Sequence, residues 1–168
     1  MKSIILFLSI TFLYAQTSFS QSSKKEEKEK AKQENYEKIK ALVKSKKIEI
    51  RALKANPTKG PQVDLTTREN FLIVSNDSAR ADLPYYGRAY SGGYSSGDAG
   101  IIFSNVMENY QEKWNDKKYN VTITFRAKGP DDSFNCTVSI YSPENASISI
   151  SSNKKQSIRY SGILTSKN

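Results

Sequence analysis

Residues 119–127 read YNVTITFRA and decide the fold class, because apolar and polar residues alternate strictly along them. The side chains on one face are apolar: Tyr119, Val121, Ile123, Phe125 and Ala127. A period of two is typical of an antiparallel strand with one face in the core and the other in water. The pattern recurs at residues 134–140 and 146–150, with turn-forming residues between the stretches. We predict a mainly β fold, an antiparallel meander of about seven or eight strands in a small barrel or a sandwich.

The segment before the first strand has a helical period. Residues 24–46 hold nine Lys and five Glu and lack Pro and Gly. In their second half the apolar residues recur at helical spacing: Tyr36, Ile39, Leu42 and Val43. We predict a helix whose last turns dock on the β domain and whose first turns are solvated. Because Glu interleaves with Lys, a solubilising tether is favoured over a basic arm that binds anionic polymers or membranes.

The first twenty residues predict export. Lys2 precedes a short apolar core at residues 4–13, and Ser18 and Ser20 supply the small side chains that signal peptidase requires before Gln21. The apolar run is far shorter than the roughly 20 residues that span a bilayer. We therefore expect cleavage after Ser20, a periplasmic or secreted protein, no lipid anchor and no later transmembrane segment. The expected organisation is a signal peptide at 1–20, a charged helical segment at 21–46 and a β-barrel domain at 47–168.

Composition excludes much chemistry. The chain has 168 residues, no His and one Cys, so triads with His, His metal sites and an internal disulfide framework cannot form within it. Lys and Arg number 26 against 17 Asp and Glu, giving a net charge of +9, but the charges are scattered and follow no nucleic-acid-binding motif. We expect no enzyme activity, metal, cofactor or nucleic-acid partner. Cys136 is in phase with Phe134 and Val138, which predicts a buried, unreactive thiol.

Residues 82–100, DLPYYGRAYSGGYSSGDAG, break the alternation and form the best candidate site. Tyr offers amphipathic contact area with few rotatable bonds, and an Arg among aromatic rings can meet an anionic group. The candidate ligand-binding residues are Tyr85, Tyr86, Arg88, Tyr90 and Tyr94. A purely structural role stays open, in which the first two tyrosines plug one end of the barrel and the arginine pairs with Asp82 or Asp98.

Residues 93–97, GYSSG, match the G-x-S-x-G pattern of hydrolases. That motif needs a strand, a sharp turn, a helix and a nearby His, and this chain has no His. The match therefore does not predict a catalytic serine.

The stretch Leu83-Pro84-Tyr85-Tyr86-Gly87-Arg88, followed by Ala89-Tyr90, resembles the hallmark of a family of exported Bacteroidota proteins, the domain of unknown function 4251. Residues 151–163, SSNKKQSIRYSGI, are similar to the closing pattern of that family, with Lys155 where the family has Arg. The resemblance covers roughly residues 35–165. It implies a lipocalin-like β-barrel preceded by a helix, and no known activity, cofactor or catalytic residue.

Two functions follow as hypotheses. The first is a non-enzymatic barrel that binds a small amphipathic ligand or an envelope component through the Tyr- and Gly-rich loop. The second is an interaction protein that docks on another envelope protein or polymer through the loop or the basic helix. The barrel interior discriminates between them, because a packed interior leaves no room for a ligand and favours docking.

Overall fold

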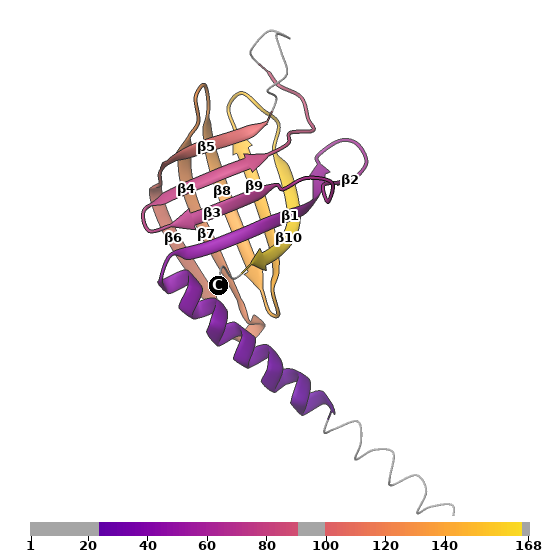
Figure 1. The fold of residues 1–168 in the computed structure, drawn as a ribbon, viewed down its shortest axis with the longest axis vertical. Coiled ribbons are helices and arrows are strands. Elements are labelled where there is room, and N and C mark those ends of the chain that lie inside the picture. Colours follow the sequence, from indigo (N-terminus) through magenta and orange to yellow (C-terminus); the bar gives the residue numbers. More distant parts are fainter. Residues whose placement is uncertain (1–23, 91–99, 166–168) are drawn as a thin grey trace, which may run out of the picture.

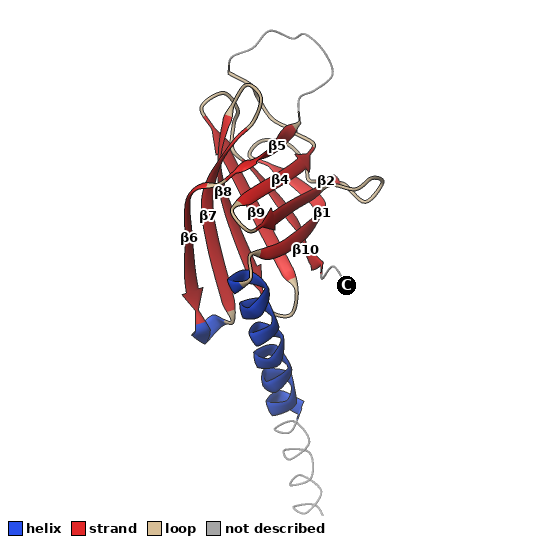
Figure 2. Cartoon of the chain, turned by 60° about the vertical axis from the view of Figure 1, so that its left-hand side comes forward, coloured by secondary structure: helices blue, strands red, loops and turns tan. Residues whose placement is uncertain are grey.

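The computed structural model describes residues 24–90 and 100–165. They form one N-terminal helix over residues 24–44 and a ten-stranded antiparallel sheet (Figures 1 and 2). The predicted signal peptide, the GYSSG motif and Tyr94 lie outside the described residues. No helix in the described ranges is long and apolar enough to cross a membrane.

The ten strands and one short 3-10 helix follow each other along the chain. They are β1 (Lys47–Pro57), β2 (Val63–Asp64), β3 (Phe71–Ser75), β4 (Ser78–Leu83), β5 (Ile101–Val106), β6 (Glu108–Asn115), η1 (Asp116–Lys118), β7 (Asn120–Lys128), β8 (Ser133–Tyr141), β9 (Asn145–Ser152) and β10 (Ile158–Thr165). The count exceeds the predicted seven or eight because β2 has only two residues and residues 101–115 form two strands.

The strand order is β5-β4-β3-β1-β10-β9-β8-β7-β6, with β2 pairing with β1. Two meanders, one on each side of the β1–β10 pair, therefore form a single sheet that curls into a nearly closed barrel. Figure 1 shows β1, β3, β4 and β5 crossing obliquely in front of β7, β8 and β9. The seam lies between the consecutive strands β5 and β6, where the chain turns at Met107. These observations confirm the predicted mainly β, antiparallel barrel with one N-terminal helix.

The interior of the barrel is filled by apolar side chains. Strands β7, β8 and β9 bury alternate residues, as their sequence predicts. The largest buried side chains of the barrel include Tyr160, Phe103, Phe125 and Phe134, none more than 3% exposed. Burial of each large aliphatic side chain contributes about 1.5–3 kcal/mol, so this core is the main source of stability. Among the described residues, Asn70 is the one buried polar side chain, and its amide donates 2.9 Å hydrogen bonds to two carbonyls.

The last turns of the helix close one end of the barrel (Figure 2). Tyr36, Ile39 and Val43 are buried there, whereas residues 24–34 are exposed along their whole length. This confirms the predicted docking of the second half of the helix and the solvation of its first half.

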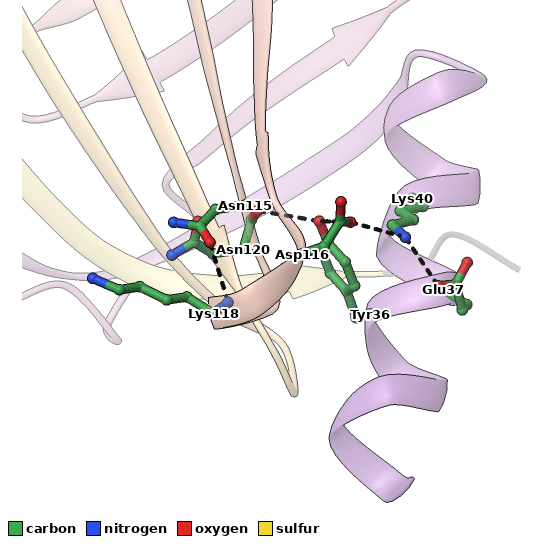
Figure 3. Close-up of polar contacts among 7 residues, drawn as sticks. All are labelled: Tyr36, Glu37, Lys40, Asn115, Asp116, Lys118 and Asn120. Atoms are coloured by element: carbon green, nitrogen blue, oxygen red, sulfur yellow. Dashed lines mark hydrogen bonds and ion pairs between the residues drawn. The ribbon is translucent and has the colours of Figure 1, made fainter. Parts of the chain in front are cut away.

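A polar cluster fixes the helix to the turn between β6 and β7 (Figure 3). The Tyr36 hydroxyl donates a 3.0 Å hydrogen bond to the Asp116 carboxylate, and the Lys40 ammonium lies 3.1 Å from the same group. The Lys40 hydrogen bond, followed by that of Tyr36, lowers the pKa of Asp116. The carboxylate therefore stays charged and joins the helix to η1 at neutral pH.

Two strand boundaries predicted from sequence are wrong. Tyr119 does not begin β7; it adopts the left-handed conformation (φ 50°, ψ 48°) as the residue that ends η1. The apolar residues in the stretch 101–110 predict one further strand, but the chain divides there at Met107, whose N–H donates a 2.8 Å hydrogen bond to the Asp77 carbonyl. In both places a hydrogen bond to a residue outside the strand overrides the period-two pattern.

Gly162 allows β1 and β10 to approach each other. A Cβ at this position would overlap the Arg51 carbonyl oxygen and lie 3.0 Å from the Ala52 Cα. The register between the two strands shifts at the same place, between Ala52 and Lys54. A strand requires glycine where a second backbone approaches closely beside a β-bulge.

We expect Gly162→Ala to lower the free energy of unfolding by about 1–3 kcal/mol, because the methyl group meets backbone that cannot move aside. Urea unfolding measures the change. Ser151→Ala, on the exposed side of β9, serves as the control and should stay within about 0.5 kcal/mol of the parent. Equal stability of the Gly162 variant and the parent would contradict the assigned β1–β10 contact.

Cys136 is 1% exposed, and burial raises the pKa of its thiol to about 12. A water-soluble aromatic disulfide reagent at pH 8 tests this burial. We expect the reagent to react more than about a hundredfold more slowly with the native protein than with the protein in urea. In the native protein the reagent cannot reach the sulfur, and the thiol is not ionised to the reactive thiolate. One thiol per chain should titrate after unfolding. Rapid reaction of the native protein would place the thiol at the surface.

Candidate functional site

The predicted site lies at the end of the barrel opposite the helix (Figure 1). Residues 84–90, here called the cap segment, follow β4 and pair with the connection between β9 and β10. The Tyr90 N–H donates to the Lys154 carbonyl at 2.7 Å, and the Gln156 N–H donates to the Arg88 carbonyl at 2.9 Å. From inside the barrel, the Tyr160 hydroxyl donates to the Pro84 carbonyl at 2.8 Å. The cap segment is therefore held by backbone and side-chain bonds to elements about 70 residues away.

Tyr85 is the structural centre of the cap segment. Its hydroxyl lies 2.9 Å from the carbonyls of both Arg88 and Gln156, and its ring packs against the core. Burial raises the pKa of this phenol. Gly87 leaves the space that the tyrosine occupies, because a Cβ there would overlap the Tyr85 hydroxyl. These contacts support the structural role that the sequence left open for Tyr85, and its part in ligand binding stays a prediction.

Tyr86, Arg88 and Tyr90 are exposed residues of the same segment. Tyr86 is 39% exposed and Tyr90 is 67% exposed. The ion pairs found among the described residues do not include Arg88, although Asp82 lies within the described range. These three residues, here called the cap surface, present two phenol rings and a guanidinium to solvent. Their role in binding, with that of Tyr94, stays a prediction.

Lys155 supports the cap segment from beneath, which the sequence did not reveal. Its ammonium donates to the Gly100 carbonyl at 2.8 Å and lies 5.5 Å from the Tyr85 ring centroid and 5.7 Å from that of Phe134. Burial lowers the pKa of this lysine, and the Asp132 carboxylate opposes the change. A cation between two aromatic faces is stabilising. The only sequence signal was the position of Lys155 in the family's closing pattern.

Two grooves lie on the outside of the barrel. The first, of about 460 Å³, is lined by Asn56, Pro57, Thr58, Ser149, Ser157, Ile158, Arg159 and Ser161. The second, of about 480 Å³, follows the seam where β5 passes the turn between β7 and β8, and is lined by Arg80, Ala81, Asp82, Ile102, Phe103, Ser104, Asn105, Lys128, Gly129 and Pro130. No pattern in the sequence points to either groove, because the residues of each come from distant parts of the chain.

Within residues 24–90 and 100–165, Cys, Asp and Glu side chains do not gather in groups of three that could hold a metal ion. The only buried side-chain polar atom without a hydrogen-bond partner in these ranges is Oδ2 of Asp132. It lies in the turn between β7 and β8, with Lys155 as its nearby cation.

These features define a class of protein: a small antiparallel barrel with a packed interior, a helix at one end and a tyrosine-rich cap at the other. The model of a family described as domain of unknown function (DUF4251) matches residues 30–164, and the chain belongs to this family. This confirms the resemblance carried by residues 83–90.

A solved structure agrees with this assignment. The chain is similar to the crystal structure of a DUF4251 family protein from Bacteroides eggerthii, with a TM-score of 0.61 and 18% sequence identity over 80% of this chain and 89% of that one. At this identity the likeness shows the fold alone. No curated protein matches the chain.

We expect Tyr85→Phe to lower the free energy of unfolding by about 1 kcal/mol, since it removes the one O–H group that the Arg88 and Gln156 carbonyls share. Tyr90→Phe removes the same hydroxyl from an exposed ring of the same segment and should stay within about 0.5 kcal/mol of the parent. Urea unfolding of both variants makes the comparison. Equal effects would show that the Tyr85 hydroxyl does not hold the cap segment.

Proposed function

We propose that this protein is an exported, non-enzymatic interaction protein that docks on another component of the cell envelope through the cap surface. The observation that carries the proposal is the packed interior of the barrel. A barrel that encloses a ligand needs a cavity of about 300–1,000 Å³. Here the described strands direct apolar side chains into that volume, and the two grooves lie outside it.

Both ends of the barrel also oppose entry of a small ligand. Tyr160 reaches from the core to the cap segment and bonds to Pro84, and Tyr85 lies beside it. At the other end, Tyr36 and Ile39 of the helix are buried against the barrel. The first hypothesis from sequence, an amphipathic ligand held by the barrel, therefore has less support than docking.

The cap surface has the composition of a docking site. Tyr and Arg are the residue types that most often dominate binding energy at protein interfaces, because each combines a large contact area with hydrogen bonding. Tyr86 and Tyr90 are exposed on a segment whose backbone is already fixed, so binding costs little ordering of that backbone. Arg88 adds a planar cation suited to a carboxylate or phosphate on the partner.

Two further parts of the proposal are export and a non-enzymatic role. The apolar run at residues 4–13 followed by Ser18 and Ser20 supports a cleaved leader and a periplasmic or secreted location. The chain has no His, and the thiol of its one Cys is buried with a raised pKa. His, the most frequent acid–base residue of enzymes, is thus missing, and the one thiol is inaccessible, which supports a non-enzymatic role.

Site-specific photocrosslinking tests docking at the cap surface. A benzophenone amino acid replaces Tyr90 in one version and Tyr141 in another, both in the bacterium that encodes the protein. Tyr141 is also an exposed tyrosine, 41% exposed, at the end of β8 near the helix.

We expect ultraviolet light to give a discrete crosslinked species from position 90 and not from position 141. Adding Arg88→Ala to the position 90 version should abolish it. Identical products from both positions, or no effect of the arginine change, would contradict the proposal.

Native mass spectrometry of the exported protein tests the interior. We expect the bare mass of residues 21–168, which also reports cleavage after Ser20. A reproducible amphipathic adduct that leaves on denaturation would contradict a filled interior and favour the small-ligand function. A mass that includes residues 1–20 would contradict the cleaved leader while leaving docking at the cap surface to the crosslinking result.

A further inference from the structure

The outer wall formed by β8 and β9 is rich in hydroxyl groups and lacks charge. Every outward position of these two strands holds a Ser, Thr, Asn or Tyr: Ser133, Asn135, Thr137, Ser139, Tyr141, Asn145, Ser147, Ser149 and Ser151. This is unusual for a chain in which 26% of residues are charged. Solubility alone is served by charged surfaces, so a broad uncharged hydroxyl wall indicates a surface with another use.

Strand register extends this wall into the first groove. Thr137 pairs with Ser149, Ser149 with Arg159, and Arg159 with Asn56. Paired residues on one face of neighbouring strands lie about 5 Å apart. Across the four strands, the side chains of this row are therefore two hydroxyl groups, then the Arg159 guanidinium, and then the Asn56 amide.

The groove is formed where the chain leaves the barrel wall after β1. Residues 58–62 project from the wall between β1 and β2 (Figure 1), and Pro57 and Thr58 line the side of the groove next to this projection. Hydrogen bonds fix its walls: the Thr58 hydroxyl donates to the Ser157 carbonyl at 2.6 Å, and the Asn56 amide donates to the Ser161 hydroxyl at 3.2 Å. The groove thus has a defined shape before any ligand enters.

Arg159 is the one charged side chain lining this groove. Its Nε donates to the Ser149 hydroxyl at 3.3 Å, which orients the guanidinium. The ion pairs among the described residues do not include it, and no carboxylate lines the groove. A fixed guanidinium without an acidic partner is suited to two-point contact with a carboxylate.

We propose that this groove binds an acidic sugar, a uronic acid unit of a glycan, with Arg159 on the carboxylate. The surrounding Ser, Thr and Asn groups both donate and accept hydrogen bonds, as sugar hydroxyls do. Pro57 is the partly exposed apolar side chain of the lining, because Ile158 is 2% exposed and belongs to the core; it can contact one C–H edge of a sugar ring and is too small for an acyl chain. The groove is separate from the cap surface, and the inference does not depend on docking there.

Titration calorimetry of the purified exported protein tests the proposal, with a galacturonic acid trisaccharide as the probe and the neutral galactose trisaccharide as its match. We expect binding of the acidic sugar and at least about tenfold weaker binding of the neutral one, because the charged hydrogen bonds are lost. Arg159→Gln should weaken binding of the acidic sugar by about tenfold. Urea unfolding of each variant should confirm that the fold is kept.

Arg126→Gln is the matched control. Arg126 is an exposed arginine at an outward position of β7, paired with Asn135 of the hydroxyl wall, and does not line the groove. This variant should bind within about twofold of the parent. Equal losses in the two arginine variants would show diffuse attraction and overturn the site. Equal binding of the two sugars, or no binding at millimolar concentration, would also overturn it. None of these three outcomes bears on the crosslinking from position 90, because that experiment probes the cap surface.

Discussion

The pairing of β1 with β10 is the contact on which the rest of the structure depends. Each strand is the end of a separate meander, and their ladder from Glu49–Thr165 to Pro57–Ile158 makes one sheet of the two. Gly162 permits the approach, because any side chain there would overlap the facing backbone. The same ladder sets Asn56 beside Arg159 in the first groove and brings Tyr160 beneath the cap segment. Core, cap and groove are thus consequences of one strand pair.

Local patterns in the sequence predicted the elements well. The alternation in residues 119–127, 134–140 and 146–150 marks three strands, and the helical spacing after Tyr36 marks the docked turns, because burial on one face imposes both periods. Breaks in the pattern were missed. Met107 and Tyr119 continue the apolar alternation, but each is positioned by a hydrogen bond to a residue outside its own strand. The order of apolar and polar residues along the chain does not reveal such a hydrogen bond.

The candidate site was harder to predict for a related reason. Tyr85 and Tyr86 are adjacent and chemically identical, yet one is packed and hydrogen-bonded while the other is exposed. A partner that distinguishes them is the Gln156 carbonyl of the β9–β10 connection, about 70 residues away. The groove joins residues 103 positions apart along the chain, 159 − 56, through strand register. Sequence alternation places Arg159 on an outer face but does not reveal which neighbours share that face.

The register of β1 and β10 also determines how the barrel responds to force. Antiparallel hydrogen bonds run perpendicular to the strands. The start of β1 and the end of β10 lie together at one end of their ladder, with Glu49 opposite Thr165. Tension between residues 47 and 165 therefore loads one hydrogen-bonded pair at a time and peels the ladder open like a zipper. The barrel has a large apolar core but is mechanically weak when residues 47 and 165 are pulled apart, so a machine that pulls at these two positions meets little resistance.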